Sequence, residues 1–127
     1  MHFRYQEPAP GIFRPIVSVR LYSKGVFVFY DALIDSGADR CIFHIGLTKI
    51  LKIRTGEPVK FRGISGELLQ GARAKINLSL LDWKFKTEVI FSPNLGPMAY
   101  GVLGQKGFFD NFKACFDKSR KQIEITP

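Results

Sequence analysis

Apolar and polar side chains alternate along two segments in the first third of the chain. In Ile16–Tyr22 the apolar positions are separated by Ser and Arg, and Val26–Ile34 follows after a Ser-Lys-Gly turn. Alternation with a period of two predicts a strand with one buried face, and a short glycine-containing connection predicts a hairpin. The second strand runs directly into Asp35-Ser36-Gly37. The pattern therefore predicts a β-hairpin whose second strand ends in a carboxylate.

Further strand-like segments, separated by glycine, proline and polar turns, follow along the rest of the chain. Two of them flank a tip at 63–66 bounded by glycines, which supply the positive φ that tight hairpins need. The segments 46–53 and 105–111 favour short helices, and 92–98 is a loop. The remaining predicted strands are 41–45, 57–62, 67–80, 83–91, 112–116 and 122–126.

This number of short strands predicts an all-β protein with one or two short helices, in a closed or Greek-key arrangement. The chain has 127 residues, a length that fits one domain with a hydrophobic core of its own. We therefore expect residues 1–127 to form a single domain. Residues 1–15, which carry three prolines, form an N-terminal arm that lies on the domain or reaches a partner, and 16–127 form the barrel.

The formal net charge of +8 admits a polyanionic partner, but the 19 Lys and Arg residues are scattered along the chain. No aromatic RNA-binding motif, zinc pattern or recognition helix accompanies the charge, so we expect no nucleic acid partner. No apolar run approaches the length of a membrane span, and the first residues lack the apolar core of a signal peptide. With two widely spaced cysteines, Cys41 and Cys115, expected as packed thiols, these features predict a cytoplasmic protein without a membrane partner.

Asp35 is the main candidate for chemistry. An Asp is seldom buried unless it is paired or functional, so a carboxylate at the end of an apolar strand marks either a surface turn or a site. Gly37 permits close approach of another chain, and Ser36 places a hydroxyl beside the carboxylate. A lone Asp-Ser-Gly is most often a turn, and other features of the chain are needed to decide.

Three segments of the chain resemble motifs of the retropepsin family of aspartic proteases. They have the same order and a similar spacing along the chain as in that family. Ala32-Leu-Ile-Asp-Ser-Gly-Ala38 resembles its catalytic loop, Phe61-Arg-Gly-Ile-Ser-Gly66 its flap, and Val102-Leu103-Gly104 its second hydrophobic-hydrophobic-glycine element. The resemblance covers about 15–125 and implies an acid-protease β-barrel of the retropepsin type that works as a homodimer, with a flap near 59–70.

The resemblance also implies individual roles. Asp35 is the expected catalytic residue, supported by Ser36, Gly37 and Ala38. The expected flap residues are Gly63, Ile64, Ser65 and Gly66, with Ile64 at the tip over the substrate. Val102, Leu103 and Gly104 form the strand behind the catalytic loop. Candidates for substrate binding are Asp39, Phe61, Leu68 and Met98. No metal and no cofactor is expected, and a peptide or protein substrate would lie extended beneath the flap as an added strand.

The chemistry of this family needs two carboxylates about 3 Å apart, one protonated and one ionised. The chain carries one Asp-Ser-Gly, so the second carboxylate is expected to be Asp35 of another copy, related by a twofold axis. Activity is then expected to follow a bell-shaped pH profile on the acidic side.

Two positions depart from the retroviral pattern. An arginine there follows the second glycine and pairs with an acid after the catalytic loop, whereas this chain has Gln105 in that place and Arg40 after Asp39. We expect the salt bridge that supports the dimer to be missing or rewired through Arg40 or Lys106. Two alternatives to a protease remain open: a peptide-binding dimer of the same fold with weak or no catalysis, and a basic β-barrel that binds nucleic acid.

Overall fold

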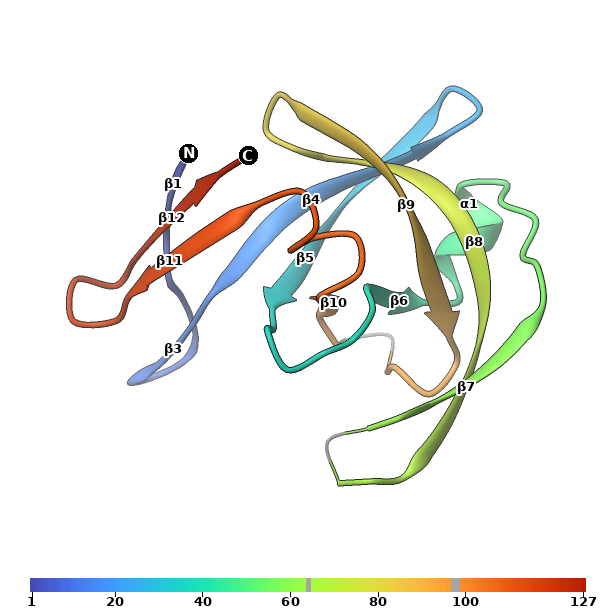
Figure 1. Cartoon of the computed structure of the whole chain (residues 1–127), viewed down its shortest axis with the longest axis horizontal. Helices are drawn as coiled ribbons and strands as arrows, with labels where there is room; N and C mark the ends of the chain where they lie inside the picture. The colour runs from blue at the N-terminus through green and yellow to red at the C-terminus, as the bar shows by residue number, and fades with distance from the viewer. Residues whose placement is uncertain (64, 97–98) are drawn as a thin grey trace.

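The computed structural model describes residues 1–63, 65–96 and 99–127, and nearly all of its regular structure is β (Figure 1). One short helix, α1 (Leu47–Ile50), lies within the segment expected to be helical. The strands of the described residues are β1 (His2–Arg4), β2 (Gln6–Ala9), β3 (Ile12–Arg14), β4 (Ile16–Ser23), β5 (Val26–Ile34), β6 (Ile42–His44), β7 (Pro58–Arg62), β8 (Leu68–Leu80), β9 (Trp83–Ser92), β10 (Gly101–Leu103), β11 (Lys113–Asp117) and β12 (Gln122–Thr126). The all-β prediction is confirmed.

The largest sheet closes on itself. Its strand order is β4-β5-β10-β6-β9-β8-β7, and β4 also pairs with β8, where Arg20–Tyr22 lie opposite 77–79. Six strands thus form a ring, and β7 continues beyond it along the outer part of β8. Closure leaves few free strand edges in the ring, which is how small barrels protect their backbone groups. The expected closed barrel is confirmed.

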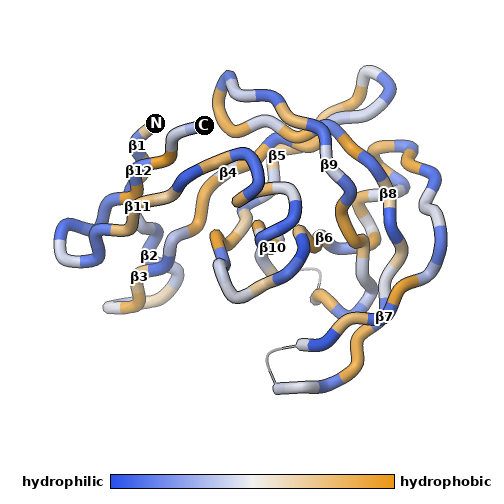
Figure 2. The backbone as a smooth tube through the Cα atoms, in the orientation of Figure 1, coloured by the Kyte–Doolittle hydropathy of each residue, from blue (hydrophilic) through white to orange (hydrophobic). Residues whose placement is uncertain are grey.

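The first predicted hairpin forms as expected. β4 and β5 pair antiparallel from Ile16 opposite Leu33 to Ser23 opposite Val26. The alternation along β4 places Val17, Val19 and Leu21 in the core, where each is at most 1% exposed. Burial of each such side chain contributes roughly 1.5–3 kcal/mol to folding, which fixes the register of the hairpin. Figure 2 shows the same change between apolar and polar positions along the barrel strands.

The first fifteen residues lie on their own chain. β1 pairs antiparallel with β12, which also pairs with β11, and the amino group of Met1 donates to the carbonyl of Ile125 at 2.8 Å. The β2–β3 hairpin contacts the turn between β11 and β12, where the Lys121 Nζ lies 4.0 Å from the centre of the Phe13 ring. The two termini consequently lie side by side (Figure 1).

The short helix expected at 105–111 is wrong, because this segment forms a series of turns. Gly107 has φ +106°, outside the helical region, and its N–H donates to the Asp110 carboxylate at 3.2 Å. Space explains the glycine: a Cβ there would lie 2.8 Å from the Thr87 hydroxyl oxygen. In addition, Cys115 is exposed on β11, so the expectation of two packed thiols holds only for Cys41.

The described residues contain no helix that combines the length and the apolar character needed to cross a membrane.

Candidate active site

Asp35 directly follows β5, whose end runs beside the short strand β10. β5 and β10 pair in parallel, with Ile34 opposite Leu103, and the N–H of Asp35 extends the pairing by donating to the Leu103 carbonyl at 3.0 Å. Ile34 and Leu103 are buried at 4% and 0% exposure. Asp35 itself is partly exposed, so the two strands deliver its carboxylate to the surface of the barrel.

The residues after Asp35 form a tight loop around its carboxylate. The N–H of Gly37 donates to Asp35 Oδ1 at 2.9 Å, and the N–H of Ala38 donates to the Asp35 carbonyl at 3.2 Å. A Cβ on Gly37 would lie 3.3 Å from the same carboxylate oxygen, tighter than most such contacts. Ser36 and Gly37 are exposed, so the outer side of the loop is accessible to another molecule.

Gly104 allows the chain after β10 to pass directly behind this loop. A Cβ on Gly104 would lie 2.6 Å from the Ala38 carbonyl oxygen and would also collide with the carbonyl of Arg40. The next residue, Gln105, donates its N–H to Ala38 at 2.8 Å and its side-chain Nε2 to the Ser36 carbonyl at 2.7 Å. Val102-Leu103-Gly104 therefore lies behind the loop, as the resemblance implies.

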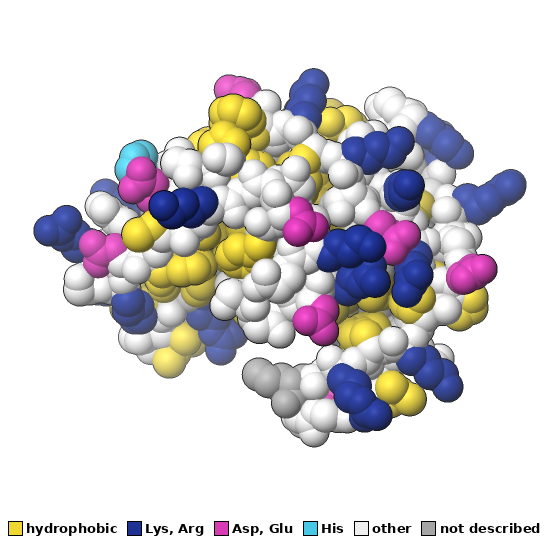
Figure 3. Space-filling view, viewed as in Figure 1, with side chains coloured by type: hydrophobic (Ala, Val, Ile, Leu, Met, Phe, Trp, Pro, Cys, Tyr) yellow, Lys and Arg dark blue, Asp and Glu magenta, His cyan; other side chains and the backbone are white. Residues whose placement is uncertain are grey.

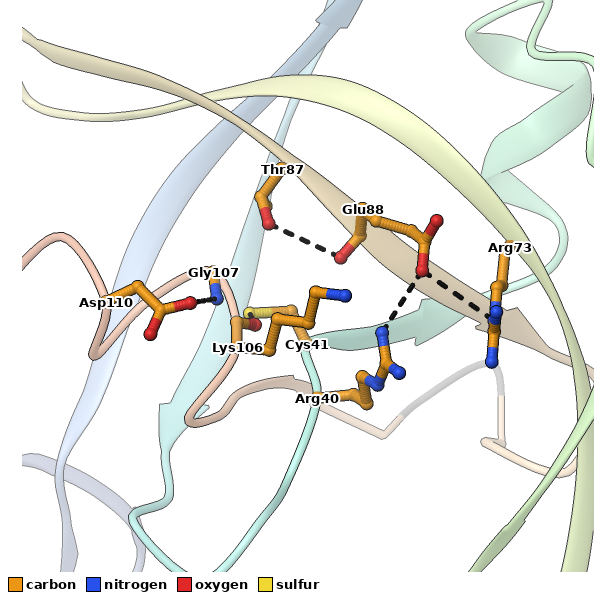
Figure 4. Close-up of polar contacts among 8 residues, drawn as sticks. All are labelled: Arg40, Cys41, Arg73, Thr87, Glu88, Lys106, Gly107 and Asp110. Atoms are coloured by element: carbon orange, nitrogen blue, oxygen red, sulfur yellow. Dashed lines mark hydrogen bonds and ion pairs between the residues drawn. The ribbon is translucent and has the colours of Figure 1, made fainter.

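Arg40 forms its ion pair within the chain. Its Nη1 lies 3.1 Å from Glu88 Oε1 on β9, and Arg73 Nε lies 3.7 Å from the same oxygen (Figure 4). Lys106 follows Gln105 and forms an isolated bridge with Arg40 through the backbone. The retroviral pattern has an arginine after the second glycine, and this chain has Gln105 at that position. The Gln105 amide bonds to the Asp35 loop, while Arg40 pairs with Glu88 on the same barrel.

Two groups, the buried Cys41 and the partly buried Tyr30, have a raised pKa. Burial raises the pKa of the Cys41 thiol, which lies 3.5 Å from the Lys106 carbonyl (Figure 4). Burial likewise raises the pKa of Tyr30, whose hydroxyl donates to the Ala99 carbonyl at 2.9 Å. Neither group offers a nucleophile or a base at neutral pH, so both act as packing and anchoring residues.

The β7–β8 hairpin projects from the barrel on the side where β5 ends (Figure 1). At its end the N–H of Gly63 donates to the Glu67 carbonyl and the Arg62 guanidinium donates to the Gly66 carbonyl, each at 2.9 Å. Gly66 has φ +81°, whereas Gly63 does not need a positive φ. Ser65 and Gly66 are exposed. Ile64, the expected tip residue, lies outside the described residues.

A cavity of about 420 Å³ separates this hairpin from the Asp35 loop. Most of its lining is apolar, and Asp35 and Glu67 are its two carboxylates. The lining residues are Asp35, Gly37, Ala38, Ile42, Phe61, Arg62, Gly63, Glu67, Leu69, Asn94, Leu95 and Val102. The structure thus brings the Asp35 loop, part of the expected flap and the strand behind the loop to one cavity.

The substrate-binding candidates have different positions. Phe61 lines the cavity, and Asp39 lines a neighbouring hollow of about 470 Å³. Leu68 is instead 55% exposed, and Leu69 takes the inward position because successive strand residues point to opposite faces. Met98 lies outside the described residues.

Sequence reasoning missed a polar connection between β8 and the loop after β9. The buried Ser92 hydroxyl donates to the Gln70 carbonyl at 2.5 Å, and the N–H of Gln70 donates to Asn94 Oδ1 at 2.8 Å. The N–H of Asn94 in turn donates to the Ser92 hydroxyl at 3.1 Å. The Ser-Pro-Asn sequence was a turn signal, but nothing local indicated Gln70 as its partner.

Solved structures with similar folds support the barrel assignment. The chain covers 88% of a retropepsin-like aspartic protease from Rickettsia conorii, over 97% of its own length, with a TM-score of 0.61 and 16% identity. It also covers 88% of the EIAV protease in complex with the inhibitor HBY-793, over 81% of its own length, with a TM-score of 0.57 and 17% identity. No family model and no curated protein sequence matches the chain. The retropepsin fold expected from the sequence is confirmed.

Proposed function

We propose that this protein is an aspartic endopeptidase whose catalytic dyad is formed by Asp35 of two identical subunits. The observation that carries the proposal is the position of Asp35 in a retropepsin fold. Its carboxylate lies at the end of a parallel strand pair and lines a mostly apolar cavity opposite a projecting hairpin. In this proposal residues 1–127 act as one domain, and the β7–β8 hairpin is the flap.

The accessibility of the Asp35 loop supports a dyad built from two copies. Ser36 and Gly37 are exposed in the single chain, and Gly37 has no side chain to block a second loop. A contact that pairs the same residue from each copy requires a twofold axis through the site. Glu67 also lines the cavity, but it belongs to the hairpin and not to the Asp35 loop.

Two carboxylates about 3 Å apart cannot both be ionised, and therefore share one proton. The protonated Asp35 donates a hydrogen bond to the substrate carbonyl, and the ionised Asp35 takes a proton from water. The water oxygen bonds to the carbonyl carbon to give a tetrahedral intermediate. Proton transfer to the amide nitrogen then breaks the C–N bond and releases an amine and a carboxylic acid. A mostly apolar cavity favours apolar side chains beside the cleaved bond.

The test is digestion of a peptide library between about pH 3 and 7, at protein concentrations where the dimer forms. Wild type is compared with Asp35→Asn and with the matched control Asp31→Asn, an exposed residue on β5, the strand that leads to Asp35. We expect cleavage by wild type and the control, inhibition by pepstatin, and none by Asp35→Asn. Absence of cleavage by wild type as well as by Asp35→Asn would instead favour a peptide-binding protein of this fold, and equal cleavage by both would exclude Asp35 as the catalytic residue.

A further inference from the structure

A basic hollow lies beside the proposed active-site cavity. It has a volume of about 470 Å³ and shares Gly37, Phe61 and Arg62 with that cavity. Its other charged lining residues are Asp39, Arg40, Lys60 and Arg73. The space around Asp35 therefore continues from a mostly apolar compartment into one in which positive charge predominates.

Two more hollows continue from this one across β8 and β9. Arg73 also lines a hollow of about 370 Å³ together with Arg54 and Lys75. Lys75 and Glu88 are shared with a third hollow of about 590 Å³, lined by Lys86 and Lys106. We call the eight Lys and Arg residues of the three hollows the basic track; they are Arg40, Arg54, Lys60, Arg62, Arg73, Lys75, Lys86 and Lys106. Figure 3 shows Lys and Arg side chains gathered on this part of the surface.

The positive charge of the basic track exceeds the negative charge among the residues that line the same hollows. The lining of the three hollows contains eight cationic residues and three carboxylates, Asp39, Glu57 and Glu88, which leaves +5 out of the net +8 of the chain. Arg40 and Arg73 share the single Glu88 carboxylate, and Arg73 Nε is buried without a hydrogen-bond partner (Figure 4). Lys75, Lys86 and Lys106 are exposed.

We propose that the basic track binds an acidic segment of the polypeptide substrate, on the same extended chain whose apolar residues occupy the cavity at Asp35. This inference rests on the proposed function and names the substrate class: a cleavable apolar site followed or preceded by Asp or Glu residues. Charges in connected hollows attract an oppositely charged chain and hold it in one register. In a twofold dimer each subunit carries one track, so an acidic segment is accepted on either side of the cleaved bond.

The lining favours a polypeptide over a single-stranded nucleic acid. Proteins that bind single strands combine positive grooves with aromatic side chains on which bases stack. Among the described lining residues of the three hollows, the aromatic side chain is Phe61, and it lies at the boundary with the active-site cavity. The basic track begins beside that cavity and shares lining residues with it. One peptide can therefore occupy the cavity with its apolar residues and the basic track with its acidic residues.

The first experiment measures binding without catalysis. Asp35→Asn protein is titrated into a fluorescein-labelled peptide with an apolar centre and a hexaglutamate extension, and fluorescence anisotropy is followed at low salt. In this background Lys75→Glu/Lys86→Glu is compared with Lys24→Glu/Lys49→Glu, which changes the net charge equally at exposed positions outside the three hollows. We expect the first pair to weaken binding by roughly three- to tenfold, and the control pair to change it less than twofold.

The second experiment measures cleavage of the same apolar peptide with and without the acidic extension, placed at either end. We expect a higher kcat/KM for the extended peptides, and we expect this preference to fall in Lys75→Glu/Lys86→Glu and to decrease as salt is raised. Equal kcat/KM for extended and unextended peptides would overturn the inference and leave the proposed function standing.

Other outcomes separate the two proposals. Binding that is equally weak in both charge-reversal pairs would overturn the basic track as the site. Tighter binding of an oligonucleotide with the same number of charges would assign the surface to nucleic acid and overturn the inference. Absence of cleavage by wild type, with hexaglutamate binding that depends on Lys75 and Lys86, would contradict the proposed protease while supporting the acidic-segment surface.

Discussion

The Gln105 side chain donates a hydrogen bond from Nε2 to the backbone carbonyl of Ser36 at 2.7 Å. This contact joins the residue after the second glycine to the middle of the proposed catalytic loop, within one chain. The resemblance puts an arginine at this position, with a role in ion pairing. Here an uncharged amide holds the loop from behind, and Arg40 pairs with Glu88 on the barrel.

We expect Gln105→Ala to lower kcat about three- to tenfold, because the loop that carries Asp35 loses its side-chain anchor. Stability should fall by about 1 kcal/mol or less, since the bond is exposed. Peptidase kinetics and urea unfolding measure the two effects. Gln122→Ala, which removes an exposed glutamine from β12, is the matched control. An unchanged kcat in Gln105→Ala would mean that the backbone bonds alone hold the loop.

Gly104→Ala should destabilise the protein by about 2 kcal/mol or more, because its Cβ collides with two backbone carbonyls that cannot rotate away. Gly96→Ala is the control: a Cβ there meets nothing within 4 Å, and we expect a change within about 0.5 kcal/mol. Urea denaturation of both variants gives the comparison. Similar midpoints for the two would show that the crossing behind the loop tolerates a side chain.

Asn94→Ala removes the acceptor for the Gln70 N–H and loosens the connection between β8 and the loop after β9. Since β8 forms one side of the proposed flap, we expect KM for a peptide to rise about threefold with a smaller change in kcat. Asn94→Asp keeps an acceptor oxygen in the same place and should restore most of the affinity. Failure of that restoration would assign the effect to packing around Leu95 rather than to the hydrogen bond.

Mixing subunits tests the shared dyad. When wild type and Asp35→Asn are combined in equal amounts and allowed to exchange, wild-type dimers make up about a quarter of the total at constant protein concentration. Because a mixed dimer has one carboxylate, peptidase activity should also fall to about a quarter. Activity that falls only to about half would mean that each subunit works alone. Equal amounts of Asp31→Asn supply the control mixture.

The turn between β11 and β12 predicts a pH-dependent contribution to stability. The pKa of Asp117 lies below its usual 3.8, because the Ser119 hydroxyl donates to the carboxylate, and the Arg120 N–H also donates. A lowered pKa in the folded state stabilises the protein above the unfolded pKa, and this contribution is lost as pH falls through the folded pKa. The Tm difference between wild type and Asp117→Ala should therefore be present at pH 7 and shrink as the pH falls below 3.8. A constant difference would exclude the charge as its cause.

The sequence predicted what depends on local pattern. The alternation in β4 and β5 and the glycine before β5 were sufficient for the first hairpin, and Asp35, Gly37 and Gly104 were identified as one unit by their resemblance to a family. Other features depend on distant partners. At Gly107 the chain packs so closely against Thr87 of β9 that a side chain would collide there, whereas the apolar run around it indicated a helix.

The candidate site likewise contains features that depend on residues far apart in the sequence. Leu68 and Leu69 are the same residue type, so the sequence does not distinguish them. Only the register of β7 against β8 decides that Leu69 lines the cavity. The Ser92–Gln70–Asn94 connection likewise requires β8 and β9 to be in place before either side chain has a partner. The basic track could not be predicted as a unit, because its residues are scattered along the chain and become neighbours only in the folded barrel.

The parallel pairing of β5 with β10 also determines when the site can form during synthesis. Asp35 leaves the ribosome before Leu103, whose carbonyl accepts the hydrogen bond from the Asp35 N–H. Contacts between residues so far apart in sequence form slowly, since the intervening chain loses entropy when the loop closes. A nascent chain that ends before β10 therefore carries the Asp-Ser-Gly sequence without its loop geometry, and the carboxylate acquires that geometry only after β10 has been synthesised.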